Sequence, residues 1–514
     1  MHLIDHFDRV AGSSPQRCCV RGGERSLSFA EVSELTWRIA SELESQGVCP
    51  GARVAIYASN SVELFVHVLC LFRLGAVWVH LNPLNGPPDN AEILGIVEAD
   101  AVLFTPAWAE HVETVKLRVA RDMRWLPIDD DSLCIKASRD TSERVRSFGP
   151  DRNPAAVVSV MCTGGTTGRP KGVPFTNLMW ETLIATFHVA IPVSEPPVCL
   201  AAAPLSHGAG VMALCVMASA ATQVIMPRFD AEAVLEAIEK HGVTHMFLPP
   251  TAIYMLLSSS SVRHRNLSSL RCLLYAGAPM SEERLREALE VFGPVMTQTY
   301  GQAEAPLICT LLSPLDHVDA LRDSPNRLRS CGRPTMFTEV SLLDSEGQVA
   351  QCGTEGEIAV RGNLAMIGYL QAGNDASVAR SPNEWHRTGD VGRFDEEGYL
   401  YIVDRKKDMI ISGGFNVYPS AIERVLFMHE SVQDCAVIGV PDEKWGEAVK
   451  AIVELKRDHS ASADELLGLC RQELGPIRTP KSLEFWEALP RSPVGKVLKS
   501  AIRERFWKEA GRRI

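Results

Sequence analysis

Short β-rich runs alternate with helix-like segments along most of the N-terminal half of the chain. Helical patterns at 28–46, 62–74 and 231–241 separate runs rich in branched and aromatic residues. A strand, a helix and a second strand in that order form a crossover connection, which is typical of parallel sheets covered by helices. The fold class predicted for this part is therefore α/β, with mostly parallel sheets. The predicted strands are 53–59, 76–81, 101–104, 155–161, 198–203, 222–226, 245–248 and 272–275.

The pattern changes after about residue 330, where glycine-punctuated runs alternate polar and apolar residues. Examples are 356–361 and the hairpin-like stretch 393–402, which turns at Glu396-Glu397-Gly398. We expect a smaller β-rich subdomain at about 330–403, belonging to an N-terminal domain over 1–403.

The charged run Asp404-Arg405-Lys406-Lys407-Asp408 precedes a final segment with its own elements. Its predicted strands are 436–440 and 448–455, and its predicted helices are 419–428 and 463–474. We expect a hinge at Asp404 and a smaller, mobile α+β C-terminal domain over 404–514.

The composition indicates a globular enzyme. The chain has 514 residues, of which 46% are hydrophobic. This length is too great for a single hydrophobic core, so several folding units are expected. A formal net charge of −11 argues against a nucleic-acid partner, because phosphate backbones bind surplus Lys and Arg. The 14 cysteines lack paired metal-ligand spacing and are interpreted as reduced core thiols.

The most apolar run, 64–81, is interrupted by His67, Arg73 and His80, so no stable membrane insertion is expected. A cytoplasmic protein is predicted. The oligomeric state is left open, a homodimer included.

A strand-like run at 157–161 leads into the glycine- and threonine-rich stretch 163–172. Glycines let backbone N–H groups turn toward an anion, hydroxyls add donors, and Lys171 supplies a mobile positive charge, so a phosphate-binding loop is predicted. No Gly-Lys-Ser/Thr triplet closes it, and the dinucleotide Gly-x-Gly-x-x-Gly pattern is absent. A plain surface loop is the alternative. Besides Lys171, the predicted contacts are Thr163, Gly164, Gly165, Thr166, Thr167 and Gly168.

This stretch resembles the signature of the acyl-adenylate-forming superfamily, which includes acyl-CoA synthetases, luciferases and the adenylation domains of peptide synthetases. The family usually reads Thr-Ser-Gly-Thr-Thr-Gly-x-Pro-Lys-Gly, and Gly164 here stands in place of Ser. Further motifs follow in the family's order, from about Phe29 to Lys499, so the resemblance covers nearly the whole chain.

Two of these motifs imply the acyl and adenine sites. The stretch 204–210 resembles the element whose His, here His207, borders the acyl pocket; amino-acid-activating members commonly carry an Asp nearby, so an uncharged acyl tail is favoured. The resemblance implies that Tyr300 stacks on adenine and that Glu304 helps to hold Mg²⁺. Ala303 replaces a Thr that contacts the α-phosphate. The other implied nucleotide contacts are Gly277, Ala278, Pro279, Thr299, Gly301 and Gln302.

The remaining motifs imply the ribose site and the moving parts. Asp390 and Arg405 resemble the ribose-binding pair, and a carboxylate suits a vicinal diol. Gly413 and Gly414 resemble the segment that enters the site in the second half-reaction. Lys496, near the end of the chain, matches the lysine that catalyses adenylation.

The resemblance implies an ATP-dependent acid–thiol ligase. It would convert a carboxylic acid, as a small-molecule substrate, into its acyl-adenylate with release of pyrophosphate, then transfer the acyl group to coenzyme A. ATP, Mg²⁺ and coenzyme A would be its cofactors. Two alternatives stay open here: loading of a separate carrier protein, and a non-catalytic acyl-nucleotide-binding protein, to which Ala303 lends weight.

Overall fold

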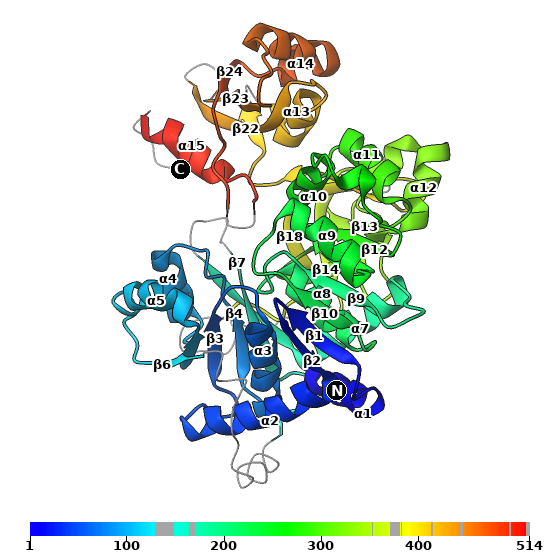
Figure 1. Ribbon diagram of the computed structural model, residues 1–514. Coiled ribbons are helices and arrows are strands. Elements are labelled where there is room, and N and C mark those ends of the chain that lie inside the picture. The colour runs from blue at the N-terminus through cyan, green and yellow to red at the C-terminus, as the bar shows by residue number, and fades with distance from the viewer. Residues whose placement is uncertain are drawn as a thin grey trace.

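The computed structural model describes residues 1–128, 149–163, 170–351, 353–370, 381, 383–412, 415–442, 446–492 and 495–509. The described strands form four sheets. Figure 1 shows that the elements of the last hundred residues, from α13 to α15, gather at one end of the molecule, away from the N-terminus.

The first sheet has six strands in the order β6-β5-β3-β4-β7-β8. Neighbouring strands are parallel except for β7 and β8, which are antiparallel. Helix α3 makes the crossover from β3 to β4; the Ser61 hydroxyl caps its start, and Gly75 ends it with a φ of 79°. The strands are β3 (Arg53–Tyr57), β4 (Val77–His80), β5 (Ala101–Phe104), β6 (Arg124–Pro127), β7 (Val157–Thr163) and β8 (Lys171–Thr176).

The second sheet has nine strands in the order β15-β14-β13-β12-β11-β9-β10-β1-β2. Its centre is parallel, and antiparallel strands close both edges. The strands are β1 (Cys18–Gly22), β2 (Arg25–Ser28), β9 (Val198–Ala201), β10 (Thr222–Ile225), β11 (His245–Leu248), β12 (Cys272–Tyr275), β13 (Met296–Gln302), β14 (Ala305–Leu312) and β15 (Arg333–Pro334).

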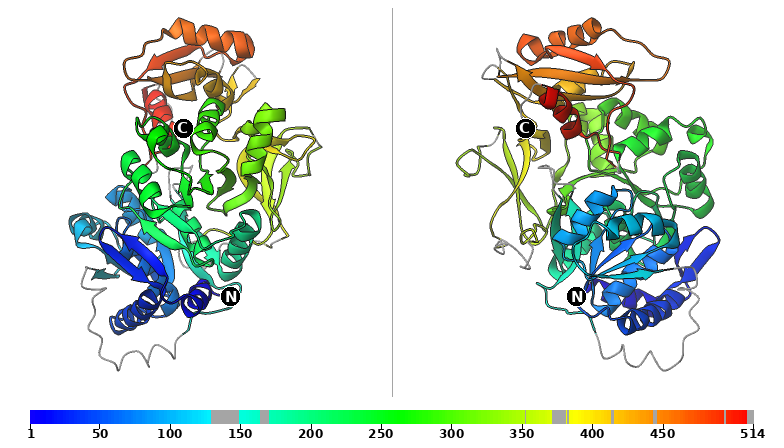
Figure 2. Two further views of the ribbon diagram at one scale, coloured as in Figure 1. Left: turned by 45° about the vertical axis from the view of Figure 1, so that its right-hand side comes forward. Right: turned by 90° about the vertical axis from the view of Figure 1, so that its left-hand side faces the viewer.

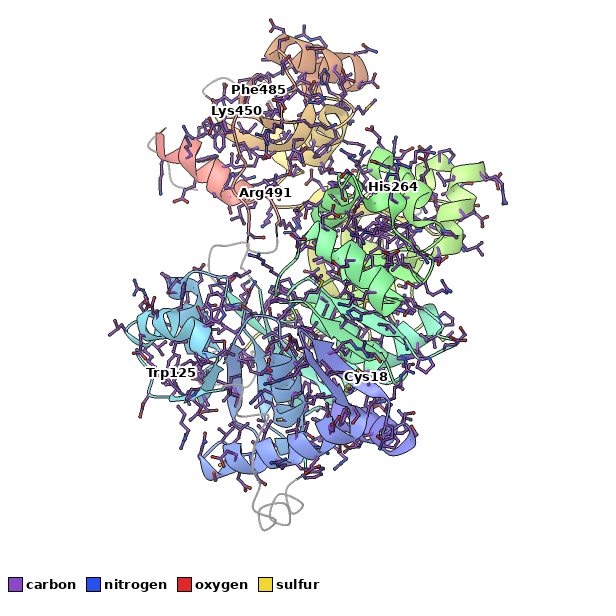
Figure 3. All side chains as sticks on the ribbon, in the orientation of Figure 1. Cys18, Trp125, His264, Lys450, Phe485 and Arg491 are labelled. Atoms are coloured by element: carbon purple, nitrogen blue, oxygen red, sulfur yellow. The ribbon has the colours of Figure 1, made fainter. Side chains whose placement is uncertain are left out.

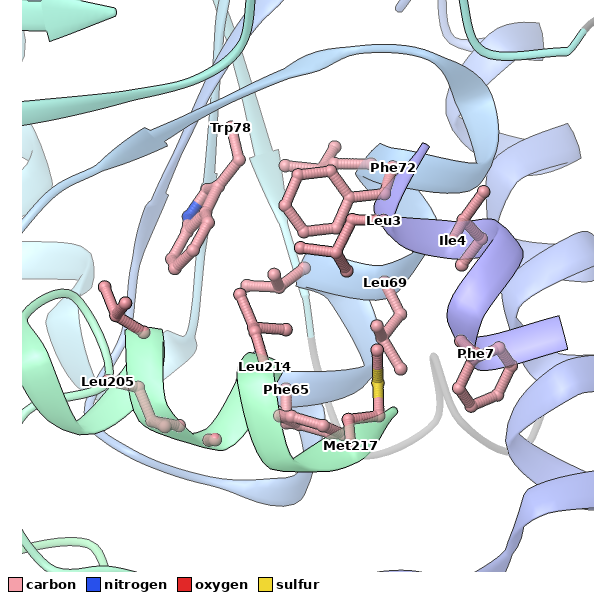
Figure 4. Packing of buried hydrophobic residues seen from close by; sticks show 14 of the residues in the cluster. Leu3, Ile4, Phe7, Phe65, Leu69, Phe72, Trp78, Leu205, Leu214 and Met217 are labelled. Carbon is pink, nitrogen blue, oxygen red and sulfur yellow. The ribbon is translucent and has the colours of Figure 1, made fainter. Parts of the chain in front are cut away.

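Helices fill the space between and around these sheets. They are α1 (Leu3–Ser13), α2 (Phe29–Ser45), α3 (Val62–Leu74), α4 (Pro87–Ile96), α5 (Ala109–Lys116), α7 (Asn177–Ala190), α8 (Gly208–Met217), α9 (Ala231–His241), α10 (Pro250–Leu257), α11 (Glu282–Phe292) and α12 (Pro314–Asp323). The largest hydrophobic cluster joins both sheets through α3 and α8. In Figure 4, Phe65 and Leu69 of α3 lie beside Leu214 and Met217 of α8, and all four are buried.

The other two sheets belong to the C-terminal third of the chain. An antiparallel sheet contains β16 (Glu339–Leu343), β17 (Gly356–Arg361), β18 (His386–Phe394) and β19 (Leu400–Arg405). A five-stranded sheet follows, with β20 (Ile410–Ser412), β21 (Phe415–Val417), β22 (Val432–Asp442), β23 (Gly446–Leu455) and β24 (Ser482–Phe485). Its helices are α13 (Pro419–Leu426), α14 (Ala463–Arg478) and α15 (Lys499–Glu509). Figure 2 shows these last elements as a separate layer above the rest.

The predicted fold class is confirmed, and most predicted elements are present with small shifts of their ends. The helix expected at 28–46 is present as α2. It begins after Ser28, because Ser28 and Glu31 form a capping box in which Ser28 is the residue just outside the helix. The strand expected at 436–440 is twice as long, as β22, because it pairs with β23 along nearly its whole length. Long-range pairing of this kind leaves little trace in a local pattern.

The described helices and cysteines bear on two further expectations. None of the helices in the described ranges combines the length and apolarity that crossing a bilayer requires. All twelve cysteines that the structure describes carry free thiols, and most are buried. Burial raises the pKa of the Cys272 thiol to about 12, so this group behaves as a small apolar side chain.

Candidate active site

The predicted phosphate loop connects two antiparallel strands. Thr163 ends β7, and its backbone pairs with Lys171 at the start of β8. The predicted contacts Gly164, Gly165, Thr166, Thr167 and Gly168 lie outside the described residues. The loop therefore closes a hairpin, whereas a P-loop leads from a strand into a helix.

Lys171 is linked to Glu304 through the ring of Tyr369, a residue that the sequence motifs did not single out. The Lys171 ammonium lies 4.6 Å from the ring centroid of Tyr369. The Tyr369 hydroxyl donates a hydrogen bond of 2.7 Å to Oε1 of Glu304. The predicted phosphate lysine and the predicted metal carboxylate thus share one aromatic neighbour.

Glu304 lies in the tight turn between β13 and β14. A β-bulge interrupts the pairing between Tyr300 and Gln302. A Cβ on Gly301 would lie 2.8 Å from the carbonyl oxygen of Ala305, so only glycine fits the bulge. The Met366 backbone N–H donates to the Glu304 carbonyl at 2.7 Å and holds the turn against the loop that carries Tyr369. Ala303, where the family has Thr, packs against the main hydrophobic cluster.

Tyr300, Asp390 and Arg405 form one connected group. The Tyr300 hydroxyl donates to Oδ2 of Asp390 at 2.7 Å, and Arg405 Nε lies 3.2 Å from Oδ1 of the same carboxylate. Asp390 and Arg405 are also direct partners in the pairing of β18 with β19. Burial, and then the charge of Asp390, raises the pKa of Tyr300 well above its ordinary value, so its hydroxyl stays a donor.

The predicted adenine contacts come from the segments after β12 and at the end of β13. Gly277, Ala278 and Pro279 follow the carboxyl end of β12, and a Cβ on Gly277 would meet nothing within 4 Å, so the backbone there faces open space. Gln302 donates to the Thr388 carbonyl at 3.3 Å. The Thr299 hydroxyl is buried and has no hydrogen-bond partner among the described residues. Loops at the carboxyl ends of parallel strands are where α/β enzymes bind ligands.

Lys496 lies on a loop that is held tightly at its base. The Lys496 N–H donates to Ser492 Oγ at 3.2 Å, and its carbonyl accepts from the Ser492 N–H at 2.7 Å. Arg491 anchors the loop through Asp434 at 2.7 Å and Glu454 at 3.2 Å. Figure 3 shows Arg491 at the side of the C-terminal elements that faces the rest of the molecule.

This loop lies against a helix of the N-terminal part of the chain. A Cβ on Gly495 would lie 3.2 Å from the Thr251 hydroxyl of α10. The Lys496 side chain remains accessible to solvent, yet desolvation by the surrounding protein lowers its pKa to about 8. The charge of Arg405 adds to this lowering of the pKa, and the charge of Asp390 opposes it.

His207 occupies the position just before α8, and its side chain makes no capping hydrogen bond to that helix. Burial lowers its pKa to about 4, so the ring is neutral at physiological pH, and it contacts Ser206 Oγ at 2.9 Å. A Cβ on the next residue, Gly208, would lie 2.7 Å from the Phe247 ring, so the ring fills the space beside the histidine.

The structure therefore gathers the predicted residues in two groups. One contains Asp390, Arg405 and Tyr300, and the other contains Lys171 and Glu304, with Tyr369 between them. Lys496 is related to the first group only through the effect of Arg405 and Asp390 on its pKa. Gly413 and Gly414 lie outside the described residues. Sequence reasoning missed Tyr369 and Arg491. A tyrosine after Gly368 carries no chemical signature alone, and Arg491 looks like a solvated charge until its two carboxylate partners are seen.

The chain matches a known family along most of its length. Residues 7–370 match the AMP-binding enzyme family, and residues 421–496 match the AMP-binding enzyme C-terminal domain. The chain is 36% identical to feruloyl-CoA synthase of Amycolatopsis sp., over 97% of this chain and 98% of the relative. It is 33% identical to medium/long-chain-fatty-acid–CoA ligase FadD8 of Mycobacterium tuberculosis, over 96% and 88% of the two chains.

A solved structure shows the same fold. Amide bond synthetase McbA from Marinactinospora thermotolerans superposes with a TM-score of 0.85 at 30% identity, covering 98% of this chain and 100% of that one. The chain belongs to the AMP-binding enzymes, the acyl-adenylate-forming superfamily, and is of the acyl-CoA synthetase type. It is an acid–CoA ligase, which uses ATP, Mg²⁺ and coenzyme A to convert a carboxylic acid into its thioester.

The residues present fit a magnesium ion that is shared with the nucleotide. Mg²⁺ is usually held by one or two carboxylates together with substrate phosphates. Among the described residues no group of three or more His, Cys, Asp or Glu could hold a metal alone. Glu304 is only partly buried, and it accepts the hydrogen bond from Tyr369 through Oε1. A single carboxylate beside the predicted phosphate loop suits such shared binding.

Proposed function

We propose that Lys496 and the 163–171 hairpin bind the triphosphate of ATP from opposite sides during adenylation. The observation that supports this most directly is that desolvation lowers the pKa of Lys496 and that Arg405 and Asp390 are the charged groups with the largest effect on it. In this proposal Asp390 accepts from the ribose hydroxyls, Tyr300 stacks on adenine, and Glu304 would hold Mg²⁺. The remaining predicted nucleotide contacts keep the roles given above.

The chemistry follows from charge. A carboxylate is a poor acyl donor, so its oxygen attacks the α-phosphorus and pyrophosphate leaves. Negative charge builds on the phosphorus oxygens in that transition state, and preorganised cations stabilise it. Lys496 and Lys171 supply such charges from this chain. Mg²⁺, when bound, neutralises phosphate charge as a Lewis acid.

The second half-reaction breaks the mixed anhydride. The thiolate of coenzyme A attacks the acyl carbon, the thioester bond forms, and AMP leaves with the anhydride oxygen. We propose that the segment 404–514 is a domain that rotates about Asp404 between the steps, exchanging Lys496 for Gly413 and Gly414. Asp404 is buried, and its carboxylate accepts from the backbone N–H groups of Arg405 at 2.6 Å and Ser420 at 2.9 Å. These two hydrogen bonds connect β19 to α13 at the proposed pivot.

The acid is proposed to carry an uncharged, apolar or aromatic tail. A neutral His207 beside Phe247 offers no counter-charge for an ammonium group, and burial of an unpaired charge is costly. The names of the relatives, a feruloyl-CoA synthase and a medium/long-chain-fatty-acid–CoA ligase, support this range of substrates.

Pyrophosphate release across a panel of carboxylic acids tests the assignment. We expect release with aromatic or aliphatic acids and little with amino acids. Binding of ATP without release from any acid would instead favour the non-catalytic alternative, for which Ala303 is the one supporting feature.

Comparison of acceptors tests the second half-reaction. With acyl-adenylate formed, coenzyme A should be consumed fastest, ahead of a pantetheinylated carrier protein. A simple amine belongs in the same comparison, because McbA is an amide bond synthetase. We also propose a cytoplasmic location, where free thiols persist, and gel filtration would test for a homodimer.

A further inference from the structure

Tyr369 touches the two charged groups on which phosphate and metal binding are proposed to depend. Its ring face lies 4.6 Å from the Lys171 ammonium, and its hydroxyl donates at 2.7 Å to Glu304. The three side chains are each partly buried. One aromatic side chain therefore separates a cation from an anion and contacts both.

The loop of Tyr369 is fixed to both partners through the backbone as well. The Leu370 N–H donates to the Gly172 carbonyl at 2.9 Å, next to Lys171, and the Met366 N–H donates to the Glu304 carbonyl at 2.7 Å. Three segments distant in sequence thus meet at this ring. Backbone hydrogen bonds therefore hold the loop of Tyr369 in place, in addition to the contacts of its side chain.

The separation has an electrostatic consequence. Opposite charges on neighbouring flexible side chains attract and tend to pair, particularly where water is partly excluded. A direct Lys171–Glu304 ion pair would occupy the ammonium that phosphate needs and the carboxylate that Mg²⁺ needs. A cation on a π-face and an anion on a phenol hydroxyl are both stabilised without being neutralised.

We propose that Tyr369 is a positioning residue. It keeps Lys171 and Glu304 apart and orients each side chain, so that phosphate and Mg²⁺ can bind together. The inference rests on the proposed roles of these two residues. The ring orients the lysine, and the hydroxyl orients the carboxylate. Partners that orient a metal-binding carboxylate commonly affect metal affinity as strongly as 10- to 100-fold.

Two substitutions separate the ring from the hydroxyl. Tyr369→Phe keeps the π-face and removes only the donor to Glu304, whereas Tyr369→Ala removes both. ATP binding is measured by calorimetry without any acid, so no turnover occurs, first with EDTA and then across a Mg²⁺ titration. Circular dichroism and thermal melting establish that each variant is folded.

The proposal gives a distinct result for each variant. In Tyr369→Phe, ATP affinity in EDTA should match the wild type. The Mg²⁺ concentration that gives half of the maximal increase in ATP affinity should rise about 10-fold. In Tyr369→Ala, ATP affinity in EDTA should also fall, by roughly fivefold. A Tyr369→Phe variant with wild-type Mg²⁺ dependence, or equal shifts in both variants, would overturn the proposal.

Tyr401 provides a matched control. Its hydroxyl donates to Asp395 at 2.9 Å, and the guanidinium carbon of Arg393 lies 4.7 Å from its ring centroid, so it makes the same two kinds of contact with residues that have no predicted role in the site. Tyr401→Phe should leave ATP and Mg²⁺ binding unchanged.

Lys171→Met and Glu304→Gln test the premise separately. If these two variants bind ATP and Mg²⁺ normally, the proposed residue roles are wrong. If they bind poorly while both Tyr369 variants behave as wild type, the roles stand and only the inference about Tyr369 is wrong.

Discussion

Asp390 and Arg405 are paired across β18 and β19, and Arg405 Nε lies 3.2 Å from Oδ1 of Asp390. Lys496 is carried by the loop after β24, on the other side of the proposed pivot, and the charges of Arg405 and Asp390 act in opposite directions on its pKa. This relationship supports the proposal that Lys496 acts in the first half-reaction.

Lys496→Ala is expected to slow acyl-adenylate formation by about 10²- to 10³-fold, because one preorganised cation is lost from the transition state. Thioester formation from supplied acyl-adenylate should be nearly unchanged. Pyrophosphate release measures the first step, and thioester appearance from synthetic acyl-AMP measures the second. Equal loss in both steps would contradict the assignment.

Adenylation is expected to decline as pH rises through about 8, since the pKa of Lys496 is lowered from 10.5 to about 8. The amine is protonated below this value and loses its charge above it, and kcat/KM for ATP reports the free enzyme. Lys496→Arg supplies the control, because a guanidinium stays charged throughout this range. If kcat/KM for ATP declines near pH 8 in the wild type and in Lys496→Arg alike, the titrating group is not Lys496.

Asp390→Asn is expected to weaken discrimination between ATP and 2′-deoxy-ATP. The charged carboxylate is the better acceptor for ribose hydroxyls, so its loss should raise the KM for ATP about 10-fold and that for 2′-deoxy-ATP less. Tyr300→Phe should give a smaller increase for ATP, as one hydrogen bond to the carboxylate is removed. An unchanged ratio of the two KM values in Asp390→Asn would remove Asp390 from the ribose site.

Arg491→Ala is expected to slow adenylation by roughly 10-fold while sparing transfer to coenzyme A, because the Lys496 loop loses its anchor to Asp434 and Glu454. Lys450→Ala removes a 2.8 Å ion pair with Glu484 on the same sheet and serves as control. Similar effects of the two variants on adenylation would indicate general destabilisation of the C-terminal elements.

Local chemistry made several elements predictable from sequence. Helix α9 was predicted to begin at Ala231 and end at His241, and the structure gives the same limits, because Asp230 caps one end and Gly242, with a φ of 62°, ends the other. The length of β22 was underestimated, since its ends are held by pairing with β23 and not by their own composition.

Some residues of the candidate site were also predictable from the sequence, and others were not. Residue types and their order along the chain were enough to identify the family and to nominate Lys171, Glu304, Asp390 and Lys496, because short motifs keep their chemistry within a few residues. They gave no indication of Tyr369 or Arg491, whose meaning depends on partners from other segments.

The amino-acid sequence alone establishes which chemical groups are available and which family the chain resembles. Which of these groups meet follows from the folded chain, in which Tyr300 binds Asp390 and a tyrosine ring lies between Lys171 and Glu304. The reason is physical, because such contacts form when distant segments are brought together by sheet pairing and burial, and neither is encoded in the immediate neighbours of a residue.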